Sequence, residues 1–550
     1  MKNILKKKKY LSQINTIYDL VRLAVEVYKN KIAVKVNCDN TIKNITYEQL
    51  YCDIQKVIKV IPKDWRQENL VLLGTFDYDW LVMFLAVILS GNVAVPLDKN
   101  QQEIAELIHQ CKAKAVYMDE TVTEGIEKNS NIKIFRSLSF DDDSINIWEK
   151  RKEDTLYTNV NPNVSPDDIA VLIFTSGTTG KSKGVKLSHR NIIDNTKCGL
   201  YFIEDQVKTG DCTIPVLPPT HMLQIGVGIL TPFYYGVAIC IGGSMKYISN
   251  YMQMFKPKVL ILVPMVVENM YDKVMIQVKK KIPQQKLDKI ITISNMLRKV
   301  GIDIRRYLFK DILKAFGGNL ECIICGGAAL NPEVIEGFDN FGICVYEGYG
   351  ITECSPILSC NKNKERKAGS VGVLCPPEYC EYSIIDGEIC VRGSIVFSGY
   401  YNDEEATKEV LYDGWFHTGD FGKIDADGYL FITGRKKNLI ILSDGNNVSP
   451  EEIEERFLDN TYIKSIFVNE QKYKGKKVIT AHVYPNFEDF SSLSEENLHE
   501  VINQEIKKVN KTMVAYKRIN RVVFYDTDFE KTALGKIKRY MYKEDMRDVG

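Results

Sequence analysis

The chain has 550 residues, of which 45% are hydrophobic and 26% are charged, as expected of a globular protein with more than one domain. The 72 Lys and Arg against 71 Asp and Glu leave a net charge of +1, which argues against a broad nucleic-acid-binding surface. Fourteen cysteines are too sparse for a disulfide scaffold, and without an export signal we expect reduced thiols and a cytoplasmic protein.

Short apolar runs that end in glycine or proline recur through the first 350 residues. In chain order they cover 70–73, 169–174, 213–217, 259–263, 321–325 and 343–346. Such runs predict strands buried on both faces, as in a parallel sheet between helices. Ligands bind beyond the carboxyl ends of these strands, and there the chain places its glycine-rich and polar residues. The sequence therefore predicts an α/β fold and locates a site.

Two segments, 70–97 and 213–241, share a strand–helix–glycine–strand order. Two similar α/β subdomains facing one cleft would explain this repeat, and a chance similarity is the alternative. The most apolar stretch, 80–89, is shorter than the roughly 20 apolar residues that span a bilayer. We therefore expect a buried helix at this place and no transmembrane segment.

The pattern changes after residue 361. Short alternating runs such as 387–393, and the turn Asp427-Gly428 between two such runs, predict a small antiparallel β subdomain. Ser449 and Pro450, followed by Glu452, predict the start of a helix with a capping box. Further along, the chain predicts strands at 463–468, 478–484 and 522–525 and a helix at 496–508. These elements suffice for a separate α+β domain of about 110 residues.

The segment 175–184, TSGTTGKSKG, is the most informative one. Its small residues let backbone N–H groups approach an anion, and its hydroxyls and lysines are further donors that a polyphosphate needs. Its Gly180-Lys181-Ser182 is also the ending of a Walker A loop, which would indicate a P-loop NTPase, but Thr175 stands where that motif needs its first glycine. Because 185–187 predict a strand and not a helix, we expect phosphate to be held in a hairpin-like turn.

Four further motifs follow in order: YEGYGITE at 346–353, GWFHTGD at 414–420, TGRKK at 433–437 and KTALGKIKR at 531–539. Together with the phosphate loop they resemble the adenylate-forming superfamily of acyl-CoA synthetases, adenylation domains and beetle luciferases. The resemblance covers residues from about 16 to 539. It implies an acid–thiol ligase that uses ATP to convert a carboxylic acid to acyl-AMP, and then transfers the acyl group to a pantetheine thiol.

The resemblance also implies a domain organisation. The large AMP-binding domain would cover residues 1–435, with two similar α/β subdomains to about 360 and a small β-barrel-like subdomain at 361–435. A small mobile α+β domain at 436–550 would carry the catalytic lysine.

Matched position by position, the resemblance assigns a nucleotide site. The phosphate clamp would consist of Thr175, Ser176, Gly177, Thr178, Thr179, Gly180 and Lys183. The adenine would lie between Gly326, Gly327, Ala328 and Tyr349. Thr352 would contact the α-phosphate, and Glu353 would hold Mg²⁺. Asp420 would bind the ribose hydroxyls, with Arg435 nearby.

Three residues of the small domain also receive roles from the resemblance. Lys536 would reach the α-phosphate and the substrate carboxylate, so that its charge offsets the repulsion between two anions. The hinge for domain rotation would be Lys437. After rotation, Asp444 and Gly445 would face the cleft and leave room for pantetheine.

The acyl side of the site is less specified. The segment 218–224, PPTHMLQ, matches the border of the acyl pocket, whose candidate residues are His221, Met222, Leu223 and Ile225. No Asp occurs between 215 and 245, which favours an acid without an amino group. The sequence of residues 434–455 is most similar to that of bacterial fatty-acyl-CoA synthetases. A ligase for aryl acids is the alternative.

Two positions depart from the family pattern: Ser182 replaces the usual Pro, and Gln224 replaces a frequent Glu. The acceptor thiol would belong to CoA or to a separate acyl carrier protein. The length of the acyl chain and the oligomeric state stay open.

Overall fold

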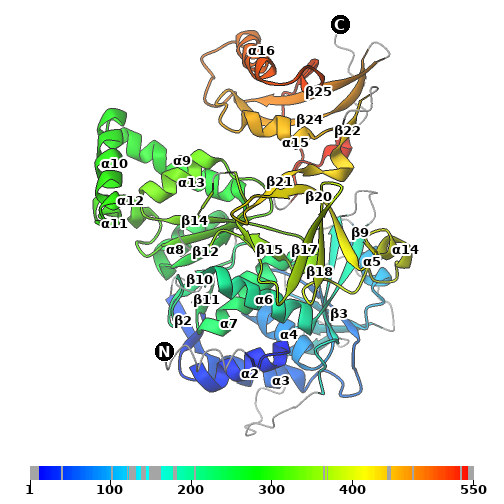
Figure 1. The fold of residues 1–550 in the computed structure, drawn as a ribbon. Coiled ribbons are helices and arrows are strands. Elements are labelled where there is room, and N and C mark those ends of the chain that lie inside the picture. Colours follow the sequence, from blue (N-terminus) through cyan, green and yellow to red (C-terminus); the bar gives the residue numbers. More distant parts are fainter. Residues whose placement is uncertain are drawn as a thin grey trace.

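The structure, a computed structural model, describes residues 12–38, 41–100, 103–119, 122, 132–137, 144–147, 163–176, 182–203, 206–243, 245–362, 366–367, 369–442, 447–473, 476–532 and 535–542. Figure 1 shows the C-terminal part, in orange and red, above the larger part formed by the rest of the chain. The larger part contains two extended α/β sheets and a smaller antiparallel sheet.

The first α/β subdomain is built on a seven-stranded sheet with the order β7-β6-β5-β3-β4-β8-β9. Its strands are β3 (Asn69–Leu73), β4 (Val93–Leu97), β5 (Ala115–Met118), β6 (Lys133–Arg136), β7 (Ser144–Asn146), β8 (Ile169–Ser176) and β9 (Ser182–Ser188). All neighbours pair in parallel except β8 and β9, which are antiparallel. Every residue of β3, β4 and β5 is buried, as continuous apolar runs require in a sheet that helices cover.

The second α/β subdomain is built on a nine-stranded sheet with the order β16-β15-β14-β13-β12-β10-β11-β1-β2. Its strands are β1 (Ile32–Cys38), β2 (Thr41–Thr46), β10 (Cys212–Ile214), β11 (Ala238–Ile241), β12 (Val259–Leu262), β13 (Cys322–Gly326), β14 (Cys344–Gly350), β15 (Ile357–Cys360) and β16 (Val373–Leu374). The strands from β14 to β1 are parallel, and the strands at both edges are antiparallel. The predicted parallel strands are confirmed, although β10 ends earlier than expected.

Helices surround the two sheets. They are α2 (Ile17–Tyr28), α3 (Tyr47–Ile58), α4 (Tyr78–Leu89), α5 (Ile104–Gln110), α6 (His189–Ile203), α7 (Thr231–Tyr235), α8 (Ile248–Phe255), α9 (Pro264–Lys281), α10 (Gln284–Lys299), α11 (Arg305–Leu308), α12 (Lys310–Ala315) and α13 (Pro332–Asn340), with the short η3 (Met245–Tyr247). From Trp80 to Leu89 every residue of α4 is buried, so the predicted buried helix is confirmed. Among the residues that the structure describes, no helix has the length and apolar character needed to cross a membrane.

The internal repeat is present in the fold. In the first unit α4 connects the parallel strands β3 and β4. In the second unit a π-helix, η2 (Gln224–Leu230), and α7 connect the parallel strands β10 and β11. The two predicted segments therefore fold as corresponding strand–helix–strand units in two different sheets.

The antiparallel subdomain contains β17 (Cys380–Ile385), β18 (Glu388–Gly393), β19 (Leu411–Tyr412), β20 (Trp415–Ile424), β21 (Leu430–Arg435) and the short α14 (Glu404–Lys408). The strand order is β17-β18-β20-β19, and β21 also pairs with β20. Asp427-Gly428 lies in the turn between β20 and β21, so the predicted hairpin is confirmed.

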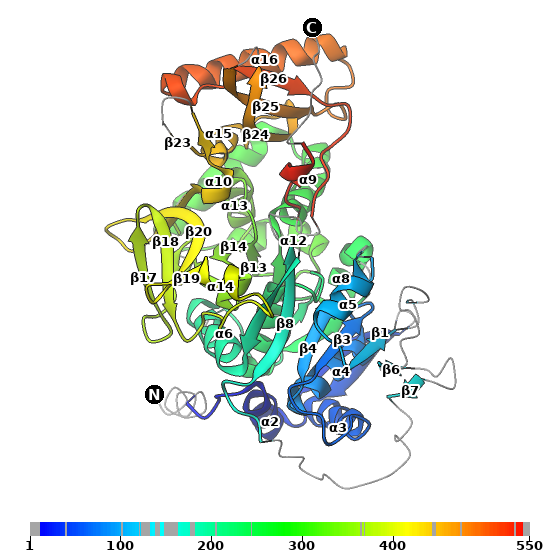
Figure 2. The ribbon, with the colours of Figure 1, turned by 90° about the vertical axis from the view of Figure 1, so that its right-hand side faces the viewer.

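The C-terminal part has a three-stranded sheet of its own, with the order β24-β25-β26. Its elements are β22 (Ile440–Ile441), β23 (Asn447–Val448), α15 (Pro450–Glu454), η6 (Glu455–Phe457), β24 (Ile463–Tyr473), β25 (Lys476–Pro485), α16 (Glu495–Thr512), η7 (Ala515–Lys517), β26 (Arg521–Phe524) and η8 (Arg539–Tyr542). Figure 2 shows α16 crossing above this sheet. A separate hydrophobic core, which includes Val468, Ile479 and Ile502, lies between the helix and the strands.

One prediction about this part is wrong. Ser449 is the N-cap of α15, but its side chain makes no capping hydrogen bond, and its hydroxyl donates to the Glu451 carboxylate instead (2.9 Å). The reason is a close contact with the larger part, because a Cβ added to Gly434 would lie 2.2 Å from Ser449 Oγ. Ser449 therefore points toward β21 rather than over the end of its helix.

The cysteines agree with the sequence analysis. All fourteen are free thiols, and most of them are buried. The pair Cys322 and Cys325 lies inside β13, where burial raises the pKa of both thiols well above the usual value. Buried, protonated thiols of this kind are core residues rather than reactive groups.

Candidate active site

The predicted phosphate loop connects β8 to β9. Outside the described residues lie Gly177, Thr178, Thr179 and Gly180. At the base of the loop Thr175 pairs with Lys183 and Ser176 pairs with Ser182, and Thr175 Oγ1 donates to the Lys183 carbonyl (3.4 Å). A Walker A loop joins a strand to a helix, whereas this loop joins two antiparallel strands. The geometry of a P-loop NTPase is therefore absent at this loop.

A polar cluster with the buried Asp420 at its centre joins the second α/β sheet to the antiparallel subdomain. Asp420 of β20 and Arg435 of β21 stand opposite each other, and Arg435 Nε donates to Asp420 Oδ1 (2.8 Å). The hydroxyl of Tyr349, near the end of β14, donates to Asp420 Oδ2 (2.7 Å). Burial, and then the neighbouring Asp420 carboxylate, raise the pKa of Tyr349. Three residues that the sequence singled out in separate motifs thus form one hydrogen-bonded cluster.

The glycine segment lies beside this cluster. Gly326 ends β13 and pairs with Gly348 of the parallel strand β14, one residue before Tyr349. A Cβ on Gly326 would lie 3.3 Å from the Gly348 carbonyl oxygen, so the two strand ends approach closely. Gly327 and Ala328 follow at this edge, and Ala328 is exposed. The carboxyl ends of β13 and β14 therefore present a flat backbone surface and an aromatic ring side by side.

Glu353 lies in the short helix η4 (Thr352–Cys354), which follows β14 and also contains Thr352. Its carboxylate accepts a hydrogen bond from the Tyr400 hydroxyl (2.8 Å). Burial, and then the Glu353 charge, raise the pKa of Tyr400. Lys183 Nζ lies 5.1 Å from the centroid of the same ring, within the range of a cation–π contact. Tyr400 thus connects Glu353, the candidate metal ligand, to the phosphate loop.

The sequence analysis missed Tyr400. The available signal was the segment Ser398-Gly399 directly before two tyrosines, because a small-residue turn followed by aromatic residues often positions a side chain at a subdomain border. In the structure Tyr400 forms an isolated bridge with Val185 of β9. This bridge holds the ring against the phosphate loop.

Lys536 lies in a tight turn of the C-terminal part. The backbone N–H of Thr532 donates to the Lys536 carbonyl (2.7 Å), and Lys531 bridges to Ile537. Burial, and then the Arg435 charge, lower the pKa of the Lys536 ammonium, while Asp420 acts in the opposite direction. The side chain still borders open space, as expected of a group that meets a ligand.

The same lysine also acts on the acyl side of the site. Burial is the main cause that lowers the pKa of His221, and the Lys536 charge contributes. The turn is docked against the large part, because a Cβ on Gly535 would lie 3.4 Å from Cβ of Met265, in the first turn of α9. The charge of Lys536 therefore acts on His221 as well as on the Asp420–Arg435 pair.

Lys437 lies in η5 (Lys436–Asn438), which directly follows β21. Burial lowers the pKa of its ammonium, and the nearby charges of Lys183 and Arg435 lower it further. The neighbouring Lys436 donates to Glu388 of β18 (2.8 Å). The crowding of cations around Lys437 favours an anionic ligand here. Asp444 and Gly445 lie outside the described residues.

The predicted acyl-pocket residues open a helix. The His221 carbonyl accepts from the N–H groups of Gln224 and Ile225 (3.0 and 3.2 Å), and the helix continues as η2 and α7. Met222 and Ile225 are buried, whereas His221 and Leu223 are half-buried. A Cβ on Gly326 would lie 3.7 Å from Leu223 Cδ2. The start of this helix therefore lies against the glycine segment.

Gln224, which departs from the family pattern, is fully buried. Its Oε1 accepts from the Leu217 N–H (3.1 Å), while its Nε2 has no partner among the described residues. Its amide lies across Gly228, where an added Cβ would be 2.2 Å from Nε2. Gln224 thus anchors η2 to the strand end and makes the wall of the site neutral.

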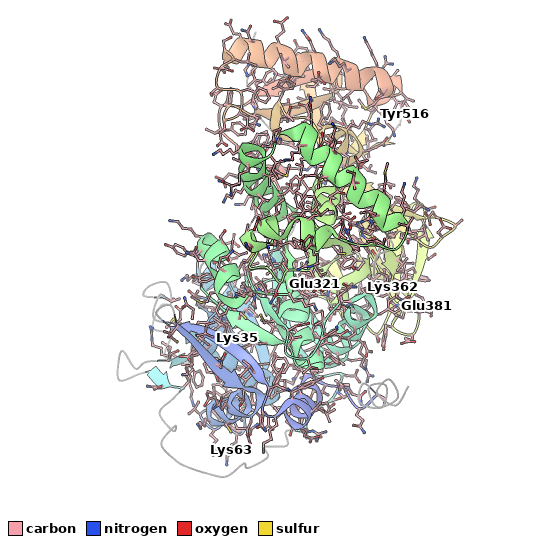
Figure 3. The ribbon with its side chains drawn as sticks, turned by 90° about the vertical axis from the view of Figure 1, so that its left-hand side faces the viewer. Lys35, Lys63, Glu321, Lys362, Glu381 and Tyr516 are labelled. Atoms are coloured by element: carbon pink, nitrogen blue, oxygen red, sulfur yellow. The ribbon has the colours of Figure 1, made fainter. Side chains whose placement is uncertain are left out.

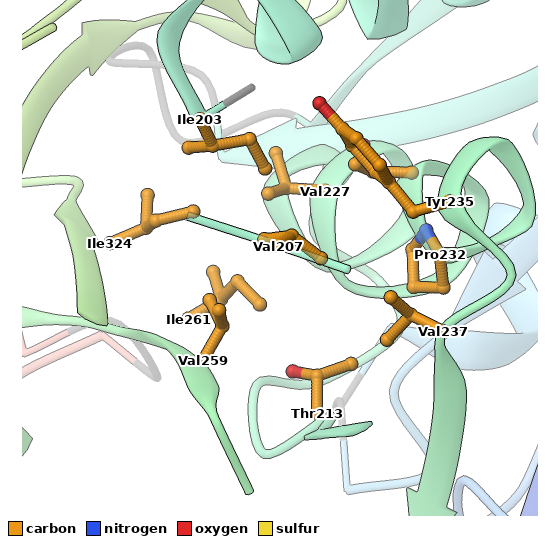
Figure 4. A pocket seen from close by; sticks show the side chains of 11 residues that line it. Ile203, Val207, Thr213, Val227, Pro232, Tyr235, Val237, Val259, Ile261 and Ile324 are labelled. Carbon is orange, nitrogen blue, oxygen red and sulfur yellow. The ribbon is translucent and has the colours of Figure 1, made fainter. Parts of the chain in front are cut away.

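A small apolar cavity lies behind this helix (Figure 4). It has a volume of about 30 Å³, room for about two water molecules. Its lining comes from η2, α7 and strands β10 to β13, and includes Val227, Ile261 and Ile324. Thr213 also lines it, and its buried hydroxyl has no partner within the described part of the chain.

Comparisons with known proteins agree with the geometry. The sequence profile of the AMP-binding enzymes matches residues 21–401, and the profile of the AMP-binding enzyme C-terminal domain matches residues 437–548. Long-chain-fatty-acid–CoA ligase 5 of Mus musculus is 30% identical over 520 residues, which cover 85% of this chain and 75% of that protein. Long-chain-fatty-acid–CoA ligase FadD15 of Mycobacterium bovis is 28% identical over 431 residues, which cover 73% and 70%.

A solved structure shows the same fold. ATP-bound MatB from Rhodopseudomonas palustris aligns with a TM-score of 0.74 over 96% of this chain and 99% of that chain, at 22% identity. The family profile covers more than half of the chain, and the mouse relative matches most of its length. This chain therefore belongs to the family of AMP-binding enzymes, which is the adenylate-forming superfamily that its motifs resemble.

Proposed function

We propose that this enzyme uses ATP to activate a long-chain fatty acid as acyl-AMP, and then transfers the acyl group to the thiol of coenzyme A. The names of the two relatives support the acid and the acceptor, and the ATP-bound neighbour supports the nucleotide. The observation that carries the proposal is the hydrogen-bonded cluster of Tyr349, Asp420 and Arg435, together with the charge of Lys536, which acts on this cluster and on His221. One ammonium group can then act on a nucleotide and on an acid together.

In the proposed nucleotide complex the adenine lies between the glycine segment and Tyr349. Asp420 accepts hydrogen bonds from the ribose hydroxyls, since a carboxylate is the strongest acceptor for a pair of hydroxyls. Thr352 donates to the α-phosphate. The β- and γ-phosphates lie in the loop between β8 and β9, near the ammonium groups of Lys183 and Lys437.

The residues at Glu353 fit a magnesium ion. A carboxylate oxygen suits this hard cation, which keeps most of its waters and also binds phosphate oxygens. No group of three or more His, Cys, Asp or Glu side chains that could hold a metal occurs among the described residues, so a single carboxylate beside phosphates is the fitting arrangement. The ion would neutralise charge on the phosphates, and Tyr400 would hold the Glu353 carboxylate in place.

The first half-reaction needs two anions to meet. An oxygen of the fatty-acid carboxylate attacks the α-phosphorus, the bond to the β-phosphate oxygen breaks, and pyrophosphate leaves with the electron pair. The Lys536 ammonium lies where it can offset charge on both partners. It acts in its protonated form, which its lowered pKa makes sensitive to alkaline pH.

In the second half-reaction the thiol sulfur attacks the acyl carbon. The bond to the AMP oxygen breaks, AMP leaves, and the thiol proton passes to solvent. We propose that the domain at 436–550 first rotates on the domain at 1–435 with Lys437 as the hinge, and that Gly445 then borders the pantetheine arm. Free thiols throughout the chain fit a reducing compartment such as the cytoplasm.

The acyl side fits an apolar acid. Leu223 lies against the glycine segment, and apolar side chains line the cavity behind η2. An acyl chain would need more room than the cavity holds, so the helix must move when it binds. The π-helical turn is a suitable wall for this movement, because π-turns interrupt regular helix bonding and occur at functional sites.

A substrate screen tests the proposal. Pyrophosphate release is measured with ATP and a panel of long-chain, short-chain and aryl acids, each with and without CoA, and the thioester is identified by mass. We expect release with long-chain acids and a thioester only with CoA. Release with aryl acids alone would show the alternative aryl-acid ligase. ADP and phosphate as the products would contradict adenylate chemistry.

A further inference from the structure

The helical segment between β12 and β13 has an unusual charge. Twelve Lys and Arg and three Asp between residues 273 and 314 give it a net charge of +9, whereas the whole chain carries +1. The segment contains most of α9, all of α10 and α11, and most of α12. Figures 1 and 3 show α10 at the outer surface of the molecule, and in Figure 3 it lies across the face turned to the viewer. A strong positive charge therefore belongs to one helical segment of a nearly neutral protein.

Apolar side chains are exposed on the same helix. Ile293, Met296 and Val300 are 57%, 63% and 71% exposed, and their spacing of three and four places them on one face. The inner side of α10 packs in the usual way, since Leu287 and Ser294 are buried. The helix thus has a second apolar stripe, which none of the described residues covers.

The stripe continues beyond the helix. Ile302 and Tyr307, which follow in the loop and in α11, are 52% and 78% exposed. Five large apolar side chains exposed in fifteen residues are a patch rather than isolated surface residues, and such patches mark interaction sites.

Unpaired lysines extend the stripe toward the other end of α10. Lys286 and Lys289 precede Ile293 at helical spacing on the same face. Neither forms an ion pair within the described residues, whereas the neighbouring Arg298 is paired with Asp339 (2.6 Å). The charge of Arg298 is thus balanced by a carboxylate, whereas Lys286 and Lys289 have no such partner in the described part of the chain.

We propose that this basic–apolar face, which consists of α10 with the turn before it and α11 after it, binds the surface of an anionic lipid bilayer. Aliphatic side chains enter the region between headgroups and acyl chains, and lysines attract the anionic headgroups. The inference rests on the proposed function in one respect, since long-chain acids concentrate in bilayers. The face fits lipid better than a second copy of the chain, because two such faces would repel each other.

The position of the face relative to the site agrees with this role. The same segment begins with α9, whose Met265 lies beside the turn that carries Lys536. In a protein bound through α10, helix α9 would therefore connect the lipid-bound face to the catalytic cleft.

Vesicle flotation tests the proposal on the full chain. Vesicles of phosphatidylcholine alone are compared with vesicles that also contain about 30% phosphatidylglycerol. This content of anionic lipid gives a surface charge that attracts basic segments. We expect at least about tenfold more protein on the anionic vesicles, and loss of this binding as salt rises. Equal binding to both vesicle types, or binding to neither, would overturn the proposal.

Two variants separate the contributions. The triple substitution I293S, M296S, V300S and the double substitution K286E, K289E should each lower anionic-vesicle binding by about fivefold or more. The controls are V514S and K63E, which change exposed residues in other parts of the chain. Unchanged thermal unfolding shows that each variant is folded. Binding that the variants leave unchanged contradicts the assignment to this face.

Activity on a soluble substrate separates this inference from the proposed function. Pyrophosphate release with octanoate, without vesicles, should be the same in the variants and in the wild type. If the wild type releases none with any acid, the proposed function fails, and the vesicle experiment still decides the membrane face. A dimer in sedimentation velocity that the triple substitution dissociates would show that a second copy covers the face, and would overturn the proposal.

Discussion

The nucleotide side and the acyl side of the cleft are built in different ways. On the nucleotide side, Tyr349, Asp420 and Arg435 hold one another by hydrogen bonds of 2.7 and 2.8 Å. On the acyl side, η2 and the strands behind it offer apolar surface and a cavity of about 30 Å³. Polar recognition needs fixed donors and acceptors, whereas apolar recognition needs only volume that can change. Polar recognition sites therefore produce short sequence motifs, whereas apolar pockets do not.

Replacing Lys536 tests whether one ammonium group acts on both the nucleotide side and the acyl side. Of the substitutions considered, this one should lower activity most. We expect Lys536→Ala to lower adenylate formation by about 10²- to 10³-fold, the range for one lost charge-stabilising group. Transfer from supplied acyl-AMP to CoA should persist, because that step does not use this ammonium. The measurements are pyrophosphate exchange and thioester formation in separate assays. Equal loss in both assays would contradict the role.

The pH profile gives an independent readout for the same lysine. The protonated form is the active one and its pKa is lowered, so adenylation should fall with rising pH before an ordinary lysine would titrate. Lys536→Arg keeps its charge to higher pH, and any remaining activity should fall later. A profile that is identical in both proteins would exclude titration of Lys536.

The hinge prediction concerns movement between the half-reactions. Lys437 is the second residue of η5, a place in the first turn where proline is tolerated. Lys437→Pro should therefore leave adenylation nearly intact and slow thioester formation by about 10²-fold, since a misplaced thiol site loses its geometry. Lys436→Pro is the matched control. Normal thioester formation would move the hinge elsewhere.

The hydrogen-bonded cluster should control ATP affinity. Asp420→Asn keeps the shape but removes the charge that faces Arg435 and Tyr349. We expect the KM for ATP to rise about 10- to 100-fold, the range for a charged hydrogen bond, with little change in the KM for the acid. Tyr349→Phe, which removes one donor only, should have a smaller effect. A change confined to the KM of the acid would reverse the assignment of the two sides.

Filling the cavity should change the acyl side alone. Val227 lines it, and Val227→Phe should lower kcat/KM for long-chain acids about tenfold while octanoate changes by less than about threefold. The KM for ATP should stay the same. If long and short acids lose activity equally, the cavity lies outside the acyl path.

The smallest expected effect is at Tyr400. Tyr400→Phe removes the hydroxyl that donates to Glu353 and keeps the ring near Lys183. Adenylation should fall about fivefold, less than the full value of a hydrogen bond to a charged group, because Tyr400 acts only through Glu353, and excess magnesium should restore part of it. Wild-type rates at low magnesium would show that Tyr400 does not position Glu353.

Much of the fold could be predicted because its signals are local. The run at 343–346 is continuous and apolar, and it forms β14 in the interior of a parallel sheet. The turn at Asp427-Gly428 closes the hairpin of β20 and β21. The prediction for Ser449 failed because Gly434 of strand β21 packs against its side chain, a contact that no local pattern contains.

Parts of the site could not be predicted from the sequence for the same reason. Tyr400 contacts Glu353 and Lys183 through a fold that brings three separate segments together. The second apolar stripe of α10 can be recognised only when the inner face is known, since Ile293 and Leu287 read alike in the sequence. The roles of the loop 177–181 and of Gly445 stay predictions.

The sequence by itself determined the strands, the helices, the family resemblance and the chemical types at the nucleotide site, because each depends on neighbours in the chain or on short motifs. Only the tertiary structure decided which strand ends meet and which groups lose water. The pKa of Lys536 is lowered because folding surrounds its ammonium with protein atoms and brings it within range of the Arg435 charge, and desolvation has no counterpart in a linear pattern. Packing likewise decided which apolar face of α10 is exposed to solvent.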